Sequence, residues 1–284
     1  MELKKEQIRE RLVDYCSRLG SQNKAANSLN EVSAGTISQI INNNWSLISD
    51  EMWRNIAAQI GHASKEWMIV ETRDFKLLTT ILEDAQENSI VFAVTGEAGS
   101  GKSAAFKTYL EGETQNVYLL QCNEFWNRKL FMMELLSVMG RSSAGFTVGE
   151  MMNEIVSALK KAESPLIIMD EADKLSDQVL YFFITLYNHL EDHCGIILAA
   201  TDHLEKRINR GLRLNKKGYK EIYSRFGRKF IHLSGLTTVD INAVCIANGV
   251  TDKAMIKAII EDCDNDLRRV KRKIHAAKKT NSNN

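Results

Sequence analysis

The sequence is poor in proline and has no long apolar run. A single proline among 284 residues favours a largely helical chain with few rigid turns. No apolar run approaches the roughly 20 residues of a membrane-spanning helix. The charged residues 1–10 also lack the apolar stretch of a signal peptide. We therefore expect a cytoplasmic protein with no membrane partner.

The five cysteines are scattered, odd in number and never spaced as Cys-x-x-Cys. This pattern argues against a disulfide framework or a zinc site and favours a reducing compartment. With 44% hydrophobic and 26% charged residues, the chain can bury a core. Its length is typical of two domains, or of one large domain with an appendage.

The formal net charge of +1 hides two strongly basic segments. Residues 206–229 contain ten Lys or Arg and one acid, Glu221, for a net charge of +9. Residues 267–284 contain seven Lys or Arg and no acid, so the rest of the chain has a net charge of −15. Segregated charge of this kind is typical of a surface that faces a polyanion. Two solvated helical faces would have the same composition.

The N-terminal part of the chain is predicted to be helical. Ser33 is placed to cap a helix whose Ile37 and Ile40 face the core. Asn30 occupies the preceding turn, where a left-handed residue is expected. The polar residues predicted to point outward from the helix, and to contact DNA, are Thr36, Ser38 and Gln39. Residues 28–43 resemble the turn and recognition helix of phage-repressor-like helix-turn-helix domains. A helical bundle that binds protein is the alternative.

The central part of the chain alternates short β-branched runs with helical segments. The apolar runs lie at residues 90–96, 116–122, 165–171 and 195–201. Fully apolar strands separated by helices predict an α/β fold with a parallel sheet covered on both faces. The predicted domains are a helix-turn-helix domain (1–61), an α/β core that opens with a linker (62–235) and a small helical domain with a basic C-terminal helix (236–284).

The strongest motif runs from Gly96 to Ser103 and fits G-x-x-x-x-G-K-[ST] in full, directly after an apolar run. Its glycines let the backbone curl so that several N–H groups point at phosphates, and a helix N-terminus adds its positive dipole end. Lys102 is expected to reach the β- and γ-phosphates, and Ser103 to offer its hydroxyl to Mg²⁺. The residues predicted to bind the nucleotide here are Gly96, Gly99, Ser100, Gly101, Lys102, Ser103 and Ala104.

Polar residues end the last two of these apolar runs, at 165–171 and 195–201. Asp170 and Glu171 follow one apolar run, where Asp170 is predicted to hold Mg²⁺ and Glu171 to polarise the attacking water. An acid pair at this point could instead cap a helix. The next strand ends at Thr201, which we expect to lie between the two phosphate elements and to position water. Threonine also commonly just ends a strand.

Two arginine-bearing segments follow these strands. Arg225 and Arg228 lie beyond the predicted fourth strand, where an arginine supplied to a neighbouring subunit would stabilise transition-state charge. Arg268 opens the final helix and could fold back onto the γ-phosphate.

The order of these motifs resembles that of the AAA+ ATPases: a P-loop, an Asp-Glu strand, a polar strand end, a Ser-Arg stretch and a helical lid with Leu-Arg-Arg. Together with the helix-turn-helix and the segments at 69–72 and 170–175, it resembles the B proteins of transposing phages such as Mu. The resemblance covers nearly the whole chain. The P-loop and the 170–175 segment are specific for AAA+ ATPases, whereas the domain order and the 69–72 segment point to transposition.

The resemblance implies a bacterial or phage-encoded ATPase that uses ATP and Mg²⁺. Such proteins bind duplex DNA largely without sequence preference, self-associate into a helical filament or ring, and recruit a transposase in DNA recombination. Matched by position, the catalytic residues are Lys102, Glu171, Thr201 and the trans-acting Arg225, the metal ligands are Ser103 and Asp170, the adenine side is lined by Val70 and Thr72, and the lid sensor is Arg268. Thr201 departs from the Asn that is common in the family, which is consistent with slow hydrolysis.

Related filament-forming members contact DNA near the end of the second strand. Here that region contains Arg128 and Lys129, which are the predicted phosphate contacts. The alternative places Phe125 and Trp126 in the core and leaves the two cations solvated.

Two other functions fit the same motifs. One is a helicase loader or insertion-sequence ATPase that acts on another ATPase. The other is a transcriptional regulator in which helix-turn-helix binding to an operator is the output and nucleotide is a switch. Filaments on arbitrary duplex DNA would favour the transposition protein.

Overall fold

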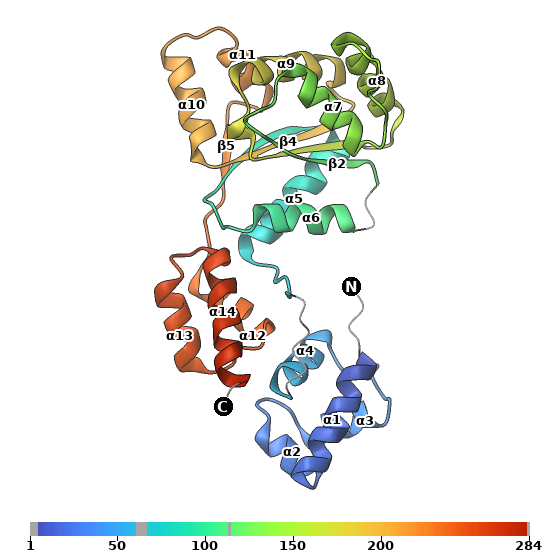
Figure 1. Ribbon diagram of the computed structural model, residues 1–284, viewed down its shortest axis with the longest axis vertical. Helices are drawn as coiled ribbons and strands as arrows, with labels where there is room; N and C mark the ends of the chain where they lie inside the picture. The colour runs from blue at the N-terminus through green and yellow to red at the C-terminus, as the bar shows by residue number, and fades with distance from the viewer. Residues whose placement is uncertain (1–4, 61–66, 113–114, 283–284) are drawn as a thin grey trace. The chain divides into compact units, whose positions relative to one another are not determined.

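A computed structural model describes residues 5–60, 67–112 and 115–282 (Figure 1). The chain forms two compact units. The first consists of residues 71–236, and the second of residues 1–70 together with 237–284. The division at residues 61 and 235 that the sequence suggests stays a prediction.

The 71–236 unit is built on a parallel sheet. In the described part of the chain, the strands are β1 (Val91–Thr95), β2 (Val117–Gln121), β3 (Leu166–Asp170), β4 (Gly195–Ala200) and β5 (Phe230–His232). Their order across the sheet is β2-β3-β4-β1-β5, and every neighbouring pair is parallel. The parallel α/β sheet predicted from the apolar runs is therefore confirmed.

Both faces of the sheet are covered. Ile167 and Met169 of β3 pack into one apolar cluster, whereas Leu166 and Ile168 pack into another on the opposite face. Successive strand residues point to opposite faces, so a strand that is covered twice must be apolar throughout. Helices α5 and α6 lie on one face, and α7, α8, α9 and α11 lie on the other (Figure 1).

The helices of this unit begin mostly at polar capping residues. Their bounds are α5 (Arg73–Asn88), α6 (Lys102–Glu111), α7 (Arg128–Val138), α8 (Val148–Lys161), the 3₁₀ helix η1 (Ala172–Lys174), α9 (Asp177–Leu190), α10 (Asp202–Arg213) and α11 (Tyr219–Arg225). The Ser176 and Asn127 side chains accept backbone N–H bonds at the starts of α9 and α7. Each cap satisfies a donor that the first helical turn leaves unpaired.

Asp74 joins the beginning and the end of this unit. Its side chain is 2% exposed, and its two carboxylate oxygens accept hydrogen bonds from the Ser234 N–H at 3.1 Å and the Gly235 N–H at 2.8 Å. The start of α5 is thereby tied to the segment that follows β5.

The second unit begins with four helices in its described N-terminal part: α1 (Lys5–Leu19), α2 (Gln22–Ser28), α3 (Ala34–Ile41) and α4 (Asp50–Gln59). Leu12, Ile37 and Trp53 are fully buried between them. Ser33 caps α3 as predicted, since its hydroxyl accepts the Thr36 N–H bond at 3.0 Å. The N-terminal helical region predicted from the sequence is therefore present.

The turn before α3 differs from the prediction in one residue. Glu31, with φ of 59°, adopts the left-handed conformation that we expected at Asn30. The backbone of Asn30 is held by α4 instead: its N–H donates to Gln59 Oε1 at 2.7 Å, and its carbonyl accepts from Gln59 Nε2 and Asn55 Nδ2. Because these bonds fix Asn30, the reversal of the chain falls on the exposed residue that follows it.

The C-terminal part of the second unit contains α12 (Thr238–Ala247), α13 (Lys253–Asp262) and α14 (Leu267–Ser282). Thr237 and Asp240 form a reciprocal capping box at the start of α12. The basic helix predicted from about residue 266 is α14.

No helix within the described ranges is both long and apolar enough to cross a membrane. All five cysteines are free and buried. Burial raises the pKa of the Cys194 thiol to about 12 and that of Cys245 to about 11, so both stay protonated at neutral pH.

Candidate nucleotide-binding site

The Gly96–Ser103 loop connects the end of β1 to the start of α6, as the motif requires. Gly99 and Gly101 have φ of 81° and 98°, a left-handed backbone conformation in which a residue with a side chain would be strained. A Cβ at Gly96 would lie 2.9 Å from the side chain of Leu233. Glycine is therefore needed at these positions for both conformation and space.

Lys102 lies inside this loop. The residue is only 8% exposed, and its Nζ donates to the carbonyl oxygens of Gly96 at 2.7 Å and Glu97 at 2.9 Å, and to Ser100 Oγ at 3.3 Å. A buried ammonium group is stable only when it is hydrogen-bonded. The loop thus presents a fixed positive charge at the N-terminus of α6, where the helix dipole also favours an anion.

Ser103 and Asp170 meet at the same edge of the sheet. The Ser103 hydroxyl donates to Asp170 Oδ2 at 2.5 Å, and the Glu171 N–H donates to Asp170 Oδ1 at 2.9 Å. Burial raises the pKa of Asp170 above its usual value, against the opposing effect of these two hydrogen bonds. A hydroxyl and a buried carboxylate are hard oxygen donors of the kind that Mg²⁺ prefers, so the pair fits such an ion.

Glu171 directly follows β3 and has a left-handed backbone conformation. Its φ is 57°, and it precedes η1. Its Oε2 accepts from Lys174 Nζ at 2.7 Å and from Gln121 Nε2 at 3.5 Å. Its side chain is 33% exposed, so water reaches the carboxylate while these two partners restrict its direction.

Thr201 directly follows β4, which lies between β3 and β1 in the sheet. Its hydroxyl donates to Asp173 Oδ2 at 2.9 Å and accepts the His203 N–H bond at 3.4 Å as the cap of α10. The strand order places Thr201 between the two phosphate elements, as expected. Its proposed role with water stays a prediction.

A polar network that was not predicted from the sequence begins at this end of the sheet. Arg207 of α10 donates to Asp177 Oδ1 at 3.1 Å, to the Leu175 carbonyl at 2.5 Å and to the Tyr219 hydroxyl at 3.4 Å. The Tyr219 hydroxyl in turn donates to Asp177 Oδ1 at 2.9 Å. Helical spacing gives a signal, because Arg207 lies on the buried face of α10 between Leu204 and Gly211.

The two candidate trans-acting arginines differ in their surroundings. Arg225 ends α11, and its Nε and one terminal nitrogen donate to Asn188 Oδ1 at 3.2 and 3.0 Å. Its guanidinium also lies 5.2 Å from the centre of the Tyr187 ring. Arg228 is exposed, with a backbone φ of 57°. Arg225 is therefore held in one direction, whereas Arg228 extends from a loop.

At the start of α7, the structure excludes part of the alternative that placed Phe125 and Trp126 in the core. Phe125 is 76% exposed, so it is not a core residue. Trp126 is half-buried and packs edge-on against Phe131, with ring centres 6.2 Å apart. Arg128 and Lys129 are both exposed. An aromatic side chain and two cations are thus accessible together.

Val70 and Thr72 are predicted to line the adenine side, and Arg268 is predicted to be the lid sensor. Thr72 is 6% exposed, and its hydroxyl caps α5 by accepting the Phe75 N–H bond at 3.2 Å. Val70 and Arg268 belong to the second unit. The roles of all three stay predictions.

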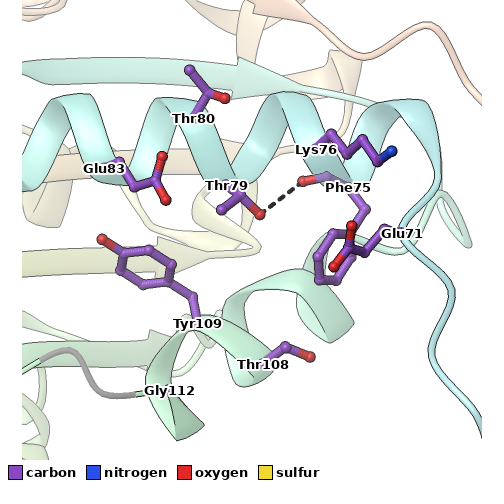
Figure 2. A pocket seen from close by; sticks show the side chains of 9 residues that line it. All are labelled: Glu71, Phe75, Lys76, Thr79, Thr80, Glu83, Thr108, Tyr109 and Gly112. Atoms are coloured by element: carbon purple, nitrogen blue, oxygen red, sulfur yellow. Dashed lines mark hydrogen bonds between the residues drawn. The ribbon is translucent and has the colours of Figure 1, made fainter. Parts of the chain in front are cut away.

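A pocket of about 480 Å³ lies between α5 and α6 (Figure 2). Its lining comprises Glu71, Phe75, Lys76, Thr79, Thr80, Glu83, Thr108, Tyr109 and Gly112. None of the P-loop residues and neither member of the acid pair contributes to it. We therefore do not assign the nucleotide phosphates to this pocket.

Comparison with known proteins gives a family match within this unit. Residues 85–208 match the family described as AAA domain, a segment that contains the P-loop, the acid pair and Thr201. The comparison with curated proteins gives no match. Among solved structures 29 chains match, including one from the structure of Drosophila ORC bound to DNA, at 13% identity and a TM-score of 0.44. That similarity covers 79% of this chain and 59% of the other.

The 71–236 unit has the fold of a P-loop domain of the AAA+ class. The family match and the parallel sheet with the phosphate loop after β1 support this assignment together.

Proposed function

We propose that the chain is a Mg²⁺-dependent ATPase that binds duplex DNA in its ATP-bound form. The observation that carries the proposal is the junction of Lys102, Ser103 and Asp170 at one edge of the parallel sheet. These residues supply a buried cation for phosphate and two oxygen ligands for a metal. Mg²⁺ held there would neutralise charge on the phosphates of ATP.

Each side chain in this site has a distinct part in hydrolysis. Lys102 would exchange its loop carbonyl partners for phosphate oxygens, and Ser103 and Asp170 would hold the metal. Glu171 accepts a proton from the attacking water, since its carboxylate is reachable by solvent and directed by Lys174 and Gln121. Arg225 completes a neighbouring subunit's site, because a guanidinium held by Asn188 and Tyr187 needs little reorganisation.

The proposal extends to DNA transposition through the resemblance of the motif order to that of phage transposition proteins. In this role the protein forms filaments or rings on target DNA and recruits a transposase. Two features support contact with DNA. Arg128 and Lys129 are exposed beside the exposed Phe125, and the outward residues of α3 (Thr36, Ser38 and Gln39) are half-exposed.

Hydrolysis is tested with Glu171→Gln. The amide keeps the shape of the side chain and loses its charge, so we expect ATP binding to persist and turnover to fall by about 10²- to 10⁴-fold. Glu163→Gln is the matched control, because Glu163 is an exposed carboxylate just before β3 in the same unit. Wild-type turnover in the Glu171 variant would show that another group is the base.

Assembly is tested by electron microscopy of the full chain with ATP and duplexes of arbitrary sequence. Continuous filaments or rings that persist longer with Glu171→Gln support the transposition role. Binding confined to one operator sequence, with no assembly, would favour the nucleotide-switched regulator. Assembly that depends on a second ATPase would favour the helicase-loader alternative.

A further inference from the structure

The turn between α10 and α11 carries a cluster of exposed positive charge. We call this cluster the basic turn and define it as Arg210, Arg213, Lys216, Lys217 and Lys220, all of which are exposed. Within the described residues, none of these five side chains takes part in a hydrogen bond or a close ion pair. By contrast, Lys206 on the same helix is paired with Asp202. The basic turn therefore presents charge that no close ion pair within the described residues neutralises.

Side-chain packing and hydrogen bonds beneath the basic turn hold its backbone in place. Tyr219 is 2% exposed and packs so closely on Gly211 that a Cβ there would lie 2.3 Å from its ring. Its hydroxyl is bonded to Asp177 and Arg207, which also bonds the carbonyl of Leu175. A surface whose backbone is already ordered loses less conformational entropy when it binds a ligand.

The chemistry of the turn favours the sugar-phosphate backbone of duplex DNA. Five cations over eleven residues suit a regular array of phosphates. Binding of single strands usually adds aromatic side chains on which bases stack. Here Tyr219 is buried, and the large apolar side chain that is exposed in the turn is Leu214, at 53%. Long-lived ion pairs with phosphates need no base readout, so this contact would be independent of sequence.

We infer that the basic turn binds the phosphate backbone of duplex DNA as a second contact, separate from that proposed for Arg128 and Lys129. This inference rests on the proposed function, because it assumes that the ATP-bound protein engages DNA. It adds a surface on α10 and α11 that helps to hold the duplex without reading its sequence.

The test compares two adjacent lysine pairs in the full chain. Lys216→Gln/Lys217→Gln removes two charges of the basic turn. Lys160→Gln/Lys161→Gln removes two exposed charges at the end of α8 in the same unit and is the matched control. Binding to labelled duplexes of several arbitrary sequences is measured over a range of salt concentrations, with a slowly hydrolysed ATP analogue.

Removing two phosphate contacts should flatten the slope of log affinity against log salt by about 1.8, since each contributes roughly 0.9. At 0.1 M salt this corresponds to a loss of affinity on the order of 50-fold for every sequence. The Lys160/Lys161 variant should keep the wild-type slope, and Lys216→Arg/Lys217→Arg should restore it.

The outcomes separate this inference from the proposed function. An unchanged slope in the Lys216/Lys217 variant, with normal DNA binding and ATPase activity, overturns the inference alone. If wild-type protein fails to bind duplex DNA in any nucleotide state, both the inference and the DNA-binding part of the proposed function fail. Equal losses in both lysine-pair variants would mean that only net charge matters and would also overturn the inference.

Discussion

The phosphate loop and the basic turn both gather positive charge in the same unit, but they hold it in opposite ways. Lys102 is 8% exposed and already bonded to three oxygens of its own loop. Lys216 and Lys217 are exposed and have no such side-chain partners among the described residues. A buried cation acts on one ligand at one position and is little affected by salt, whereas exposed cations act additively and are screened.

Arg225 sharpens the comparison most, because its exposure is intermediate between that of the buried Lys102 and that of the exposed lysines of the basic turn. If it acts on the ATP of a neighbouring subunit, Arg225→Ala should lower kcat by about 10³-fold even without DNA. Its loss should leave the salt slope of DNA binding unchanged. The nearby Arg228→Ala is the matched control and should alter kcat by no more than about twofold. Steady-state ATPase assays and salt titrations check this, and the reverse ranking would assign the role to Arg228.

Lys102→Ala tests the buried side of the comparison. Phosphate would lose a charge-assisted partner in a site of low polarity, so we expect nucleotide affinity to fall by at least about 100-fold, equally at low and high salt. Lys107→Ala, on the exposed face of the same helix, should bind as wild type does. Titration with a fluorescent ATP analogue measures both. A loss that disappears at high salt would place Lys102 with the exposed cations.

Gly211→Ala tests whether the basic turn depends on the packing beneath it. The added methyl group would collide with the Tyr219 ring, so we expect the free energy of unfolding to fall by about 1–3 kcal/mol. DNA affinity should also fall while nucleotide affinity stays close to wild type. Gly149→Ala is a control within a helix, because a Cβ there would meet nothing within 4 Å. Denaturant unfolding provides the measurement, and equal stability of the two variants would contradict the packing argument.

The smallest expected effect concerns the charge of Asp170. Burial raises its pKa, so its contribution to stability is greatest below its unfolded pKa and is lost as pH rises through the raised value. Asp170→Asn should therefore make the Mg²⁺-free protein at least as stable at neutral pH and less dependent on pH. It should also abolish stabilisation by Mg²⁺ with ATP. Thermal unfolding over a pH series decides this, and full stabilisation by Mg²⁺ with ATP in the variant would remove Asp170 from the metal site.

The sequence was sufficient wherever a site is contiguous. The P-loop and the Asp170–Glu171 pair each lie on one strand and its following turn, so local pattern located them. The strand order was not predictable, because β1 pairs with β4, whose residues lie about a hundred positions further along the chain. The same limit applies to the Thr201–Asp173 bond and to Arg207, whose partners come together only through the tertiary fold.

Two smaller outcomes have physical causes of the same kind. Asn30 was expected to be left-handed from its own propensity, but hydrogen bonds from the distant Gln59 fixed it and moved the turn to Glu31. The alternative that placed Phe125 in the core is excluded, because Phe125 is 76% exposed. In both cases tertiary contacts, or their lack, overrode a local preference.

The buried Asp74 has a consequence for how this chain is assembled. Its carboxylate accepts hydrogen bonds from the backbone N–H groups of Ser234 and Gly235. These bonds hold the first helix of the 71–236 unit to its last loop. A domain whose two ends lie close together can be inserted into another sequence without disturbing its own core. The segments before and after the 71–236 unit, residues 1–70 and 237–284, belong to one compact unit. This is the arrangement expected if the 71–236 unit were inserted at one point of that unit's sequence.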